Sequence, residues 1–185
     1  MSDAPPPPAG IRNLWAPWRI EYIRSLGGGE GGCFLCRHRD APAQDAENFV
    51  LWRGRRSFAM LNRYPYTGGH ALIAPFAHVA DLEALAPDVV LEMFALTRDT
   101  KRVLAEAAGA QGFNVGLNLG RCAGAGLPGH LHVHVVPRWE GDTNFVSVQG
   151  DVRVIPQSLA ALRTELLRTG EALGLPEMPA GPDGP

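Results

Sequence analysis

The stretch GHLHVHVVPRW, residues 129–139, places three of the six histidines of the chain at every second position. On a helix, successive members of this set would point about 200° apart, whereas a β-strand puts His130, His132 and His134 on one face. We therefore predict a strand here, with the imidazoles on one face and the intervening aliphatic side chains in a hydrophobic core. These aliphatic residues are Leu131, Val133 and Val135.

A single histidine on such a face is most often an ordinary polar residue at the solvated side of a strand. Three in strict alternation favour a functional site instead. Two functions fit the residues: an HxH strand can contribute ligands to a catalytic metal, or one histidine can be a nucleophile that its neighbours orient. The glycine-rich loop before the strand, residues 120–130, is either an ordinary surface loop or a place where backbone N–H groups approach a phosphate.

The composition indicates one globular domain with tails. The chain has 185 residues, of which 45% are hydrophobic and 19% charged, enough for one sizeable core. A net charge of -2 and a pI near 6.3 argue against a nucleic-acid polymer as partner, because such proteins usually carry a basic excess. The sequence has no signal-peptide pattern and no apolar run of about 18 residues, so we expect a cytoplasmic protein with no membrane partner.

Three segments are expected along the chain. Residues 1–28 should be a flexible N-terminus that contains a tryptophan-bearing docking arm, LWAPWRIEYIRSL at 14–26. Residues 29–146 should form the main domain, and residues 147–185 a C-terminal helix with a disordered tail. The two ends are rich in proline and glycine and cannot bury enough apolar surface to become ordered.

Five short runs of strand-forming residues predict a sheet. The runs are FVLW from Phe49, SFAML from Ser57, HALIAP from His70, FNVGLNL from Phe113 and HLHVHVV from His130. The connections between the first three are short enough for antiparallel pairing.

Two helices are expected around this sheet. The main one begins near Pro87 and ends at the glycines at 109 and 112, and a second follows Pro156. The expected apolar face of the first is Val90, Met93, Phe94, Leu104 and Ala108, and that of the second is Leu159, Leu162, Leu166 and Leu167. The sequence thus predicts an α+β fold, a five-stranded antiparallel sheet with one main helix packed on it and a C-terminal helix.

The chain resembles the histidine triad (HIT) family at three motifs in the same order. They are NRYPYTGGHALIAPFAHV at 62–79, GFNVGLNLG at 112–120 and HLHVHVV at 130–136. The LWAPWR arm and VIPQSLAALRTELL at 154–167 extend the likeness to a bacterial branch of diadenosine tetraphosphate phosphorylases and dinucleoside polyphosphate hydrolases. This resemblance implies that residues 29–146 are a catalytic domain, that two copies pair as a homodimer, and that a nucleoside monophosphate is transferred through a covalent nucleotidyl-histidine.

The resemblance also implies roles for single residues. His132 matches the nucleophile, a role that an imidazole with a pKa near 6.5 can fill without a separate base. His134 matches a position beside the bound phosphate. His70 matches one close to the reacting centre, although it could also be an ordinary hydrogen-bonded histidine of the core. Asn62 would contact the ribose and Asn118 the phosphate, although asparagines at these places could also cap a turn and a strand end.

The acceptor of the nucleotide stays open between water and phosphate. Hydrolytic members of the fragile-histidine-triad type commonly carry glutamine four positions before the first triad histidine, and here this substrate-binding position is Gly126. The enzyme is therefore either a hydrolase or a phosphorylase of dinucleoside polyphosphates. The alternative is a nucleotide-binding regulatory module with little turnover.

The pair Cys33 and Cys36 in CFLC has the spacing of a zinc knuckle and supplies two of the four ligands that a tetrahedral site needs. Zinc-bearing relatives imply His78 and His130 as the other two. His38 is an alternative fourth ligand, and free thiols in a flexible segment are the alternative to a metal. A site with four protein ligands would be structural, because no position remains open for water or phosphate.

Overall fold

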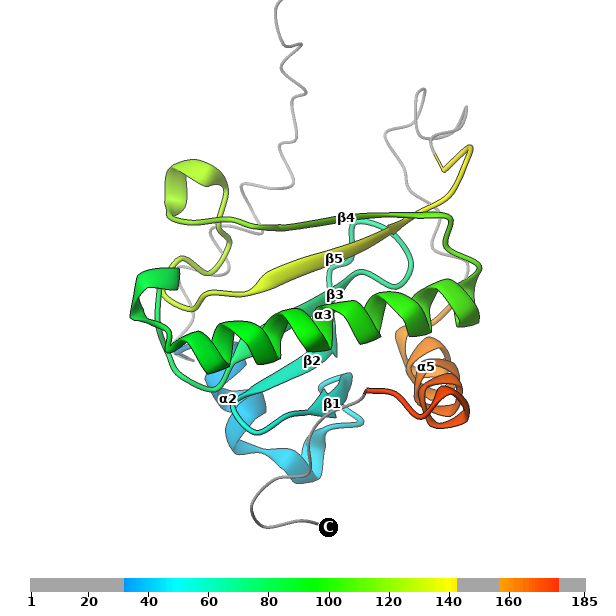
Figure 1. Cartoon of the computed structure of the whole chain (residues 1–185), viewed down its shortest axis with the longest axis horizontal. Helices are drawn as coiled ribbons and strands as arrows, with labels where there is room; N and C mark the ends of the chain where they lie inside the picture. The colour runs from blue at the N-terminus through cyan, green and yellow to red at the C-terminus, as the bar shows by residue number, and fades with distance from the viewer. Residues whose placement is uncertain (1–31, 143–156, 177–185) are drawn as a thin grey trace, which may run out of the picture. The chain divides into compact units, whose positions relative to one another are not determined.

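The computed structural model describes residues 32–142 and 157–176, so the tryptophan-bearing arm and most of the tail lie outside the described residues (Figure 1). Five antiparallel strands form one sheet in the order β1-β2-β3-β5-β4. Their bounds are β1 Val50–Arg53, β2 Ser57–Leu61, β3 Ala71–Pro75, β4 Gly112–Leu117 and β5 Val133–Arg138. The predicted α+β class and antiparallel sheet are confirmed.

The main helix, α3, spans Pro87–Ala108 and matches its predicted limits. Proline is favourable in the first turn, where its missing N–H has no helical partner, and Gly109 ends the helix in the left-handed conformation with φ 61°. The C-terminal helix, α5, spans Leu159–Leu173, and the Ser158 side chain caps it by accepting a hydrogen bond from the backbone N–H of Ala161. Helix α5 packs against α3 and β1.

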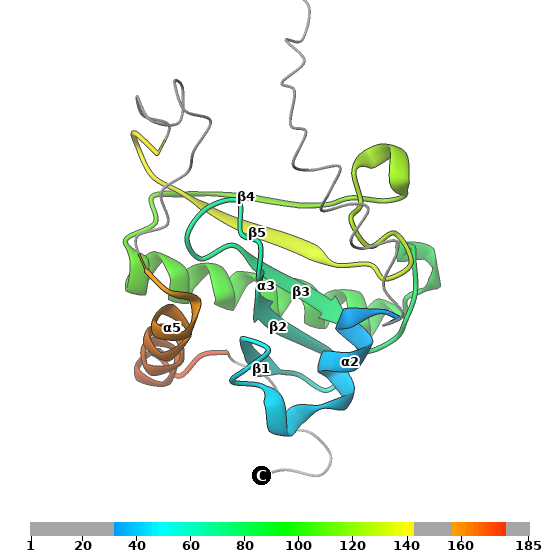
Figure 2. The same cartoon turned by 180° about the vertical axis from the view of Figure 1, so that it is seen from behind.

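The two faces of the sheet are covered by different helices. Helix α3 lies on one face, with the core residues Ala59, Leu61, Ala71, Ile73, Val133 and Val135 beneath it. A short helix, α2 at Phe34–Asp40, lies over the opposite face (Figure 2). There the buried side chain of Leu35 packs with Val50, Phe58, Met60, Leu72 and Ala74. The side-chain period of two in β2 and β3 divides these residues between the two cores.

Helix α2 was not predicted, because its seven residues are too few to show a helical period. Such a short helix is marginal by itself and depends on tertiary contacts. Arg53 of β1 supplies two of them, by donating hydrogen bonds to the carbonyl oxygens of His38 and Arg39. The Arg53 guanidinium is itself held by Asp45 at 2.6 Å.

The predicted apolar face of α3 was partly wrong. Phe94 is 53% exposed, and Val90 and Ala108 are only half-buried, whereas Met93 and Leu104 are buried as expected. The buried side chains of α3 instead lie alternately four and three positions apart, at Val89, Met93, Leu96, Thr100 and Val103. Thr97 is buried beside them.

The predicted strand starts at Phe49, His70 and His130 were each too early. Phe49 has φ 57°, outside the strand region, so β1 begins one residue later. At the other end of the sheet, the backbone N–H of Leu131 bonds to the carbonyl of Val79, in the loop after β3, at 2.7 Å. Because its partner is this loop and not a strand, β5 begins only at Val133.

The loop between β2 and β3 turns back tightly enough to place His70 at its end. The backbone N–H of Asn62 donates to the His70 carbonyl at 2.8 Å. Gly69 in this loop has φ 84°, and a Cβ there would lie 2.8 Å from Cδ2 of Leu104. Glycine is therefore required both by the backbone conformation and by the close approach of α3.

Within the described residues, none of the helices is both long enough and apolar enough to cross a lipid bilayer.

Candidate active site and metal cluster

The triad histidines lie on the face of the sheet that α2 covers. His134 pairs with Leu72 of β3 and with Gly116 of β4, and Leu72 belongs to the core beneath α2. Leu131, Val133 and Val135 point to the other face and pack under α3, as predicted. His130 is fully buried and His132 is 8% exposed. The histidines are thus not polar residues on a solvated side of the strand.

His132 has one ring nitrogen fixed by the main chain. Its Nδ1 lies 2.9 Å from the carbonyl oxygen of His130, and a carbonyl can only accept, so Nδ1 carries the proton. Nε2 then keeps its lone pair. Burial lowers the pKa of His132 below its usual value, which keeps this ring neutral at pH 7. Its role as nucleophile stays a prediction.

His70 orients His134 in a similar way. The Nδ1 atom of His70 accepts a hydrogen bond from the backbone N–H of Tyr66 at 3.1 Å, so the proton of this ring is on Nε2. That proton is donated to Nδ1 of His134 at 2.9 Å. His134 in its neutral form therefore carries its own proton on Nε2, as a donor. Burial, with His134 and His132 nearby, lowers the pKa of His70 to about 3.

The side-chain nitrogen of Asn118 lies 3.4 Å from Nε2 of His134. Both groups are donors in this arrangement, and two donors this close could both bond to one acceptor oxygen. The phosphate contact of Asn118 stays a prediction. Asn62 is used within its own loop. It accepts from the Tyr64 backbone N–H through Oδ1 and donates to Nδ1 of His70. Its ribose contact stays a prediction.

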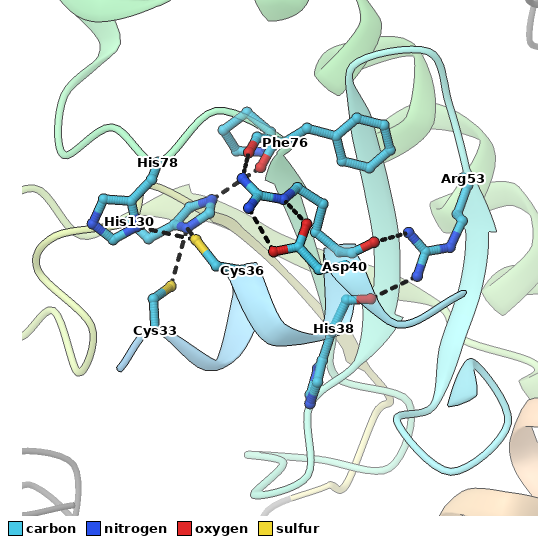
Figure 3. A network of polar contacts seen from close by, with 10 residues as sticks. Cys33, Cys36, His38, Asp40, Arg53, Phe76, His78 and His130 are labelled. Carbon is cyan, nitrogen blue, oxygen red and sulfur yellow. Dashed lines mark hydrogen bonds and ion pairs between the residues drawn. The ribbon is translucent and has the colours of Figure 1, made fainter. Parts of the chain in front are cut away.

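Four possible metal ligands meet beside the triad (Figure 3). One atom from each of Cys33, Cys36, His78 and His130 lies within 4.8 Å of the others. Nδ1 of His130 is 3.1 Å from Sγ of Cys33 and 3.5 Å from Sγ of Cys36, and Nδ1 of His78 is 3.3 Å from Sγ of Cys36. A tetrahedral zinc ion with Zn–S of about 2.3 Å and Zn–N of about 2.0 Å separates its ligand atoms by about 3.3–3.8 Å. These three pairs, at 3.1–3.5 Å, lie close to this separation, so the donor set and its spacing suit zinc.

The tautomer of His130 also suits a ligand. Its Nε2 donates to the carbonyl of Pro75 at 2.9 Å, which leaves the lone pair of Nδ1 facing the two sulfur atoms. Burial lowers the pKa of His130, and a neutral ring is the form that binds metal. A backbone carbonyl that holds the distal nitrogen is the usual support of a metal-binding histidine.

His38, the alternative ligand, lies apart from this cluster. Its ring contacts Phe34 edge-on at 5.5 Å between centroids, and Figure 3 shows it pointing away from the cysteines. Burial and the surrounding arginines lower its pKa to about 4. The four residues implied by the resemblance are thus brought together, and His38 is not among them.

Gly126 lies in the loop between the short 3-10 helix η3, Arg121–Ala123, and β5. Gly120 and Gly124 on either side of η3 have φ of 79° and 85°. These conformations explain glycine at both positions. The substrate contact of Gly126 stays a prediction.

The HIT domain family matches residues 43–141, more than half of the chain. This chain belongs to the HIT family. An AP-4-A phosphorylase of Mycobacterium tuberculosis is 40% identical over 163 residues, which cover 83% of this chain and 81% of that protein. A bis(5'-nucleosyl)-tetraphosphatase [asymmetrical] of Schizosaccharomyces pombe is 33% identical over 93 residues, covering 50% of each chain.

A solved structure of a zinc-bound HIT family protein from Mycobacterium smegmatis has a TM-score of 0.63 to this chain at 28% identity. The match covers 79% of this chain and 98% of that one. It bears out the HIT fold seen here.

The sequence did not reveal how the two sites in this HIT protein are connected. The carbonyl of His130 holds His132, while the ring of His130 faces the cysteines. The HxH spacing places both histidines on one face, but it does not show that the backbone of the first one orients the second. The contacts of Tyr66 and Pro75 are made by the main chain, and no side-chain pattern could have predicted them.

Proposed function

We propose that this HIT protein cleaves dinucleoside polyphosphates by transferring a nucleoside monophosphate through His132, with phosphate as the acceptor. The hydrogen bond from Nδ1 of His132 to the His130 carbonyl carries the proposal, because it aims an unprotonated Nε2 away from the main chain. Two relatives, an AP-4-A phosphorylase and a bis(5'-nucleosyl)-tetraphosphatase, support the substrate class.

In the first step, the lone pair of Nε2 of His132 attacks the α-phosphorus of diadenosine tetraphosphate. A P–N bond forms while the bond from phosphorus to the bridging oxygen breaks, and its electron pair leaves with ATP. The carbonyl of His130 then stabilises the positive charge on the substituted ring through Nδ1–H. Nε2–H of His134 and the amide of Asn118 are proposed to donate to a non-bridging oxygen of the transferring phosphoryl group.

In the second step, an oxygen of inorganic phosphate attacks the phosphorus of the intermediate. The P–N bond breaks, its electrons return to Nε2 of His132, and ADP is released. Phosphate as acceptor is supported by the 40% identity to the phosphorylase over most of both chains. Gly126, where hydrolytic relatives commonly have glutamine, supports it as well.

The test is to incubate the protein with diadenosine tetraphosphate, with and without phosphate, and to separate the products by anion-exchange chromatography. We expect ADP and ATP in equal amounts, and only in the presence of phosphate. AMP and ATP formed without phosphate would identify a hydrolase, and no product at all would identify a binding module. His132→Ala should reduce turnover at least about a thousandfold, whereas His38→Ala should retain it.

We also propose that Cys33, Cys36, His78 and His130 hold one structural zinc ion. The donor set of two sulfur and two nitrogen atoms is typical of such sites, and a zinc-bound relative has the same fold. The ion would link α2, which supplies the cysteines, to the loop after β3 through His78 and to the first triad histidine, His130. With four protein ligands it has no open position, so the reaction itself is carried by the histidines.

A homodimer is proposed from the free edge of β4. This strand pairs with β5 alone among the described strands, and its outer residues Asn114, Val115 and Gly116 are exposed. Sheet edges that stay exposed usually carry charged residues or proline, which prevent pairing with another chain. The β4 sequence GFNVGL has neither. A second copy that adds its own β4 across a two-fold axis would satisfy both edges with the same residues.

A further inference from the structure

Arg39, near the C-terminal end of α2, connects two segments that carry the proposed metal ligands. The first segment is α2, which has Cys33 at its N-cap position and Cys36 in its first turn. The second is the loop after β3, which carries His78. Nη1 of Arg39 donates a hydrogen bond of 2.6 Å to the carbonyl oxygen of Phe76, two residues before His78.

Asp40 holds the Arg39 guanidinium in the orientation that this contact needs. The carboxylate accepts from Nε at 2.6 Å and from Nη2 at 2.7 Å, and Nη1 is left for Phe76. Only the planar fork of arginine can make both contacts at once. The ion pair with Asp40 is largely exposed and contributes little stability by itself. Its effect is to fix where Nη1 points.

The loop that carries His78 is also held on its other side, by the residue that follows His130. The backbone N–H of Leu131 donates to the carbonyl of Val79 at 2.7 Å. His78 therefore lies between a tether to α2 and a tether to the residue that follows His130. Without the Arg39 contact, the described hydrogen bonds leave α2 joined to this loop only through the ligand side chains Cys36 and His78.

We propose that Arg39 is a positioning residue for the metal site, which holds the loop of His78 against α2 before the ion binds. This inference rests on the zinc site proposed above. Preorganisation lowers the cost of ordering the ligands when the ion arrives. Loss of such an outer contact commonly weakens metal affinity about 10–100-fold.

A second explanation would give Arg39 a purely electrostatic role. The hydrogen-bonded Asp40 carboxylate is the main group that raises the pKa of Arg39, and Cys36 and Cys33 add to it in the same direction. A cation near two thiolates could favour metal binding by charge alone. The two explanations differ in one respect, because only the tether acts through His78.

The test measures zinc affinity by competition with a chromophoric chelator. Arg39→Gln is expected to bind zinc about 10–100-fold more weakly than the unchanged protein. Arg102→Gln removes the same charge from an exposed position on α3 and should bind as the unchanged protein does. Circular dichroism of the zinc-loaded variants checks that each is folded. Should Arg39→Gln not fold, Arg39→Lys, which keeps the charge and loses the fork, replaces it throughout.

A double-mutant cycle separates the tether from the charge. In a His78→Ala background, the loop no longer carries a ligand, so Arg39→Gln should change zinc affinity by no more than about twofold. Weakening of the same size in both backgrounds, or normal affinity of the single Arg39 variant, would overturn the proposal. If the unchanged protein binds no zinc, the metal site itself is refuted, and the role of Arg39 is refuted with it.

Discussion

Single hydrogen bonds decide what each histidine can do. The main chain fixes the tautomers of three rings, through the His130 carbonyl for His132, the Tyr66 N–H for His70 and the Pro75 carbonyl for His130. Imidazoles that look equivalent in the sequence thus differ in which nitrogen has a free lone pair. His132 presents the nitrogen proposed as the nucleophile, His70 supports His134, and His130 faces the two cysteines.

The buried, neutral state of His70 predicts a pH-dependent stability. Its pKa is about 3 in the folded protein and about 6.5 when unfolded, so below pH 6.5 only the unfolded chain takes up the proton. The free energy of unfolding should fall by about 1.4 kcal/mol per pH unit from this group as the pH drops from 6.5 toward 3, and should not change above 6.5.

Urea denaturation of the unchanged protein and of His70→Gln at pH 7 and pH 5 measures this contribution. We expect the unchanged protein to lose about 2 kcal/mol more than the variant between these two pH values. Titrating groups away from His70, including His38, are common to both proteins and cancel in the comparison. Equal losses would show that His70 already takes up a proton in the folded state.

At the scale of secondary-structure elements, the positions of α2 and of the loop after β3 depend on contacts with other elements, because their own short sequences are not enough to hold them. Leu35 and the hydrogen bonds from Arg53 hold α2, and a zinc ion would add a further link to His78 and His130. Metal binding energy of this kind appears as folding stability.

Chelation should therefore lower the melting temperature of the protein while leaving its turnover nearly unchanged at temperatures where the metal-free form is still folded. Freshly purified protein should contain about one zinc ion per chain. His130→Ala should lose the metal and His38→Ala should keep it, as measured by atomic absorption. The zinc assignment fails if the fresh protein has no metal, or if the two variants behave the other way round.

The loop between β2 and β3 allows a second test at this scale. Gly69→Ala places a Cβ 2.8 Å from Cδ2 of Leu104 and 3.3 Å from Cγ of Pro137 at φ 84°. Gly109→Ala has a similar φ of 61° but nothing within 4 Å. Both variants lose the ease with which glycine adopts a left-handed conformation. Only Gly69→Ala also forces a methyl group against neighbouring side chains. Gly69→Ala should be less stable than Gly109→Ala by about 1–3 kcal/mol in urea denaturation.

At the scale of the whole molecule, β4 is one of the two edge strands of the described sheet, and α5 packs against the other, β1. Val115 of β4 is 46% exposed, and it lies on the strand proposed to pair with a second copy. We expect light scattering to give twice the mass of one chain. Val115→Lys should shift the protein toward the monomer, because two lysines would meet near the two-fold axis. Leu173→Lys is the control, because this exposed apolar residue lies on α5, which packs against β1 at the opposite edge of the sheet. A monomer at all concentrations would contradict the pairing.

The sequence alone determined the features that neighbouring residues encode. The period of two around the triad predicted a strand with histidines on one face and Leu131, Val133 and Val135 in the core. Pro87 and Gly109 marked the limits of α3. Each of these depends on the conformation of a few consecutive residues, so local sequence is sufficient to predict it. The resemblance to the HIT family then supplied residues that no local rule would have connected, among them His78 as a partner of the cysteines.

Only the tertiary structure decided what depends on distant partners. His130 meets Cys33 across 97 positions of the chain, β5 begins late because Leu131 pairs with the loop after β3, and Phe94 faces outward although it is apolar. The groups that pack around a residue set its burial and, for a histidine, its tautomer. They also decide which of two apolar faces of a helix lies against the core. The sequence limits these groups by type, but the fold selects them, because a hydrogen bond or a metal ligand requires atoms within a few ångströms of one another.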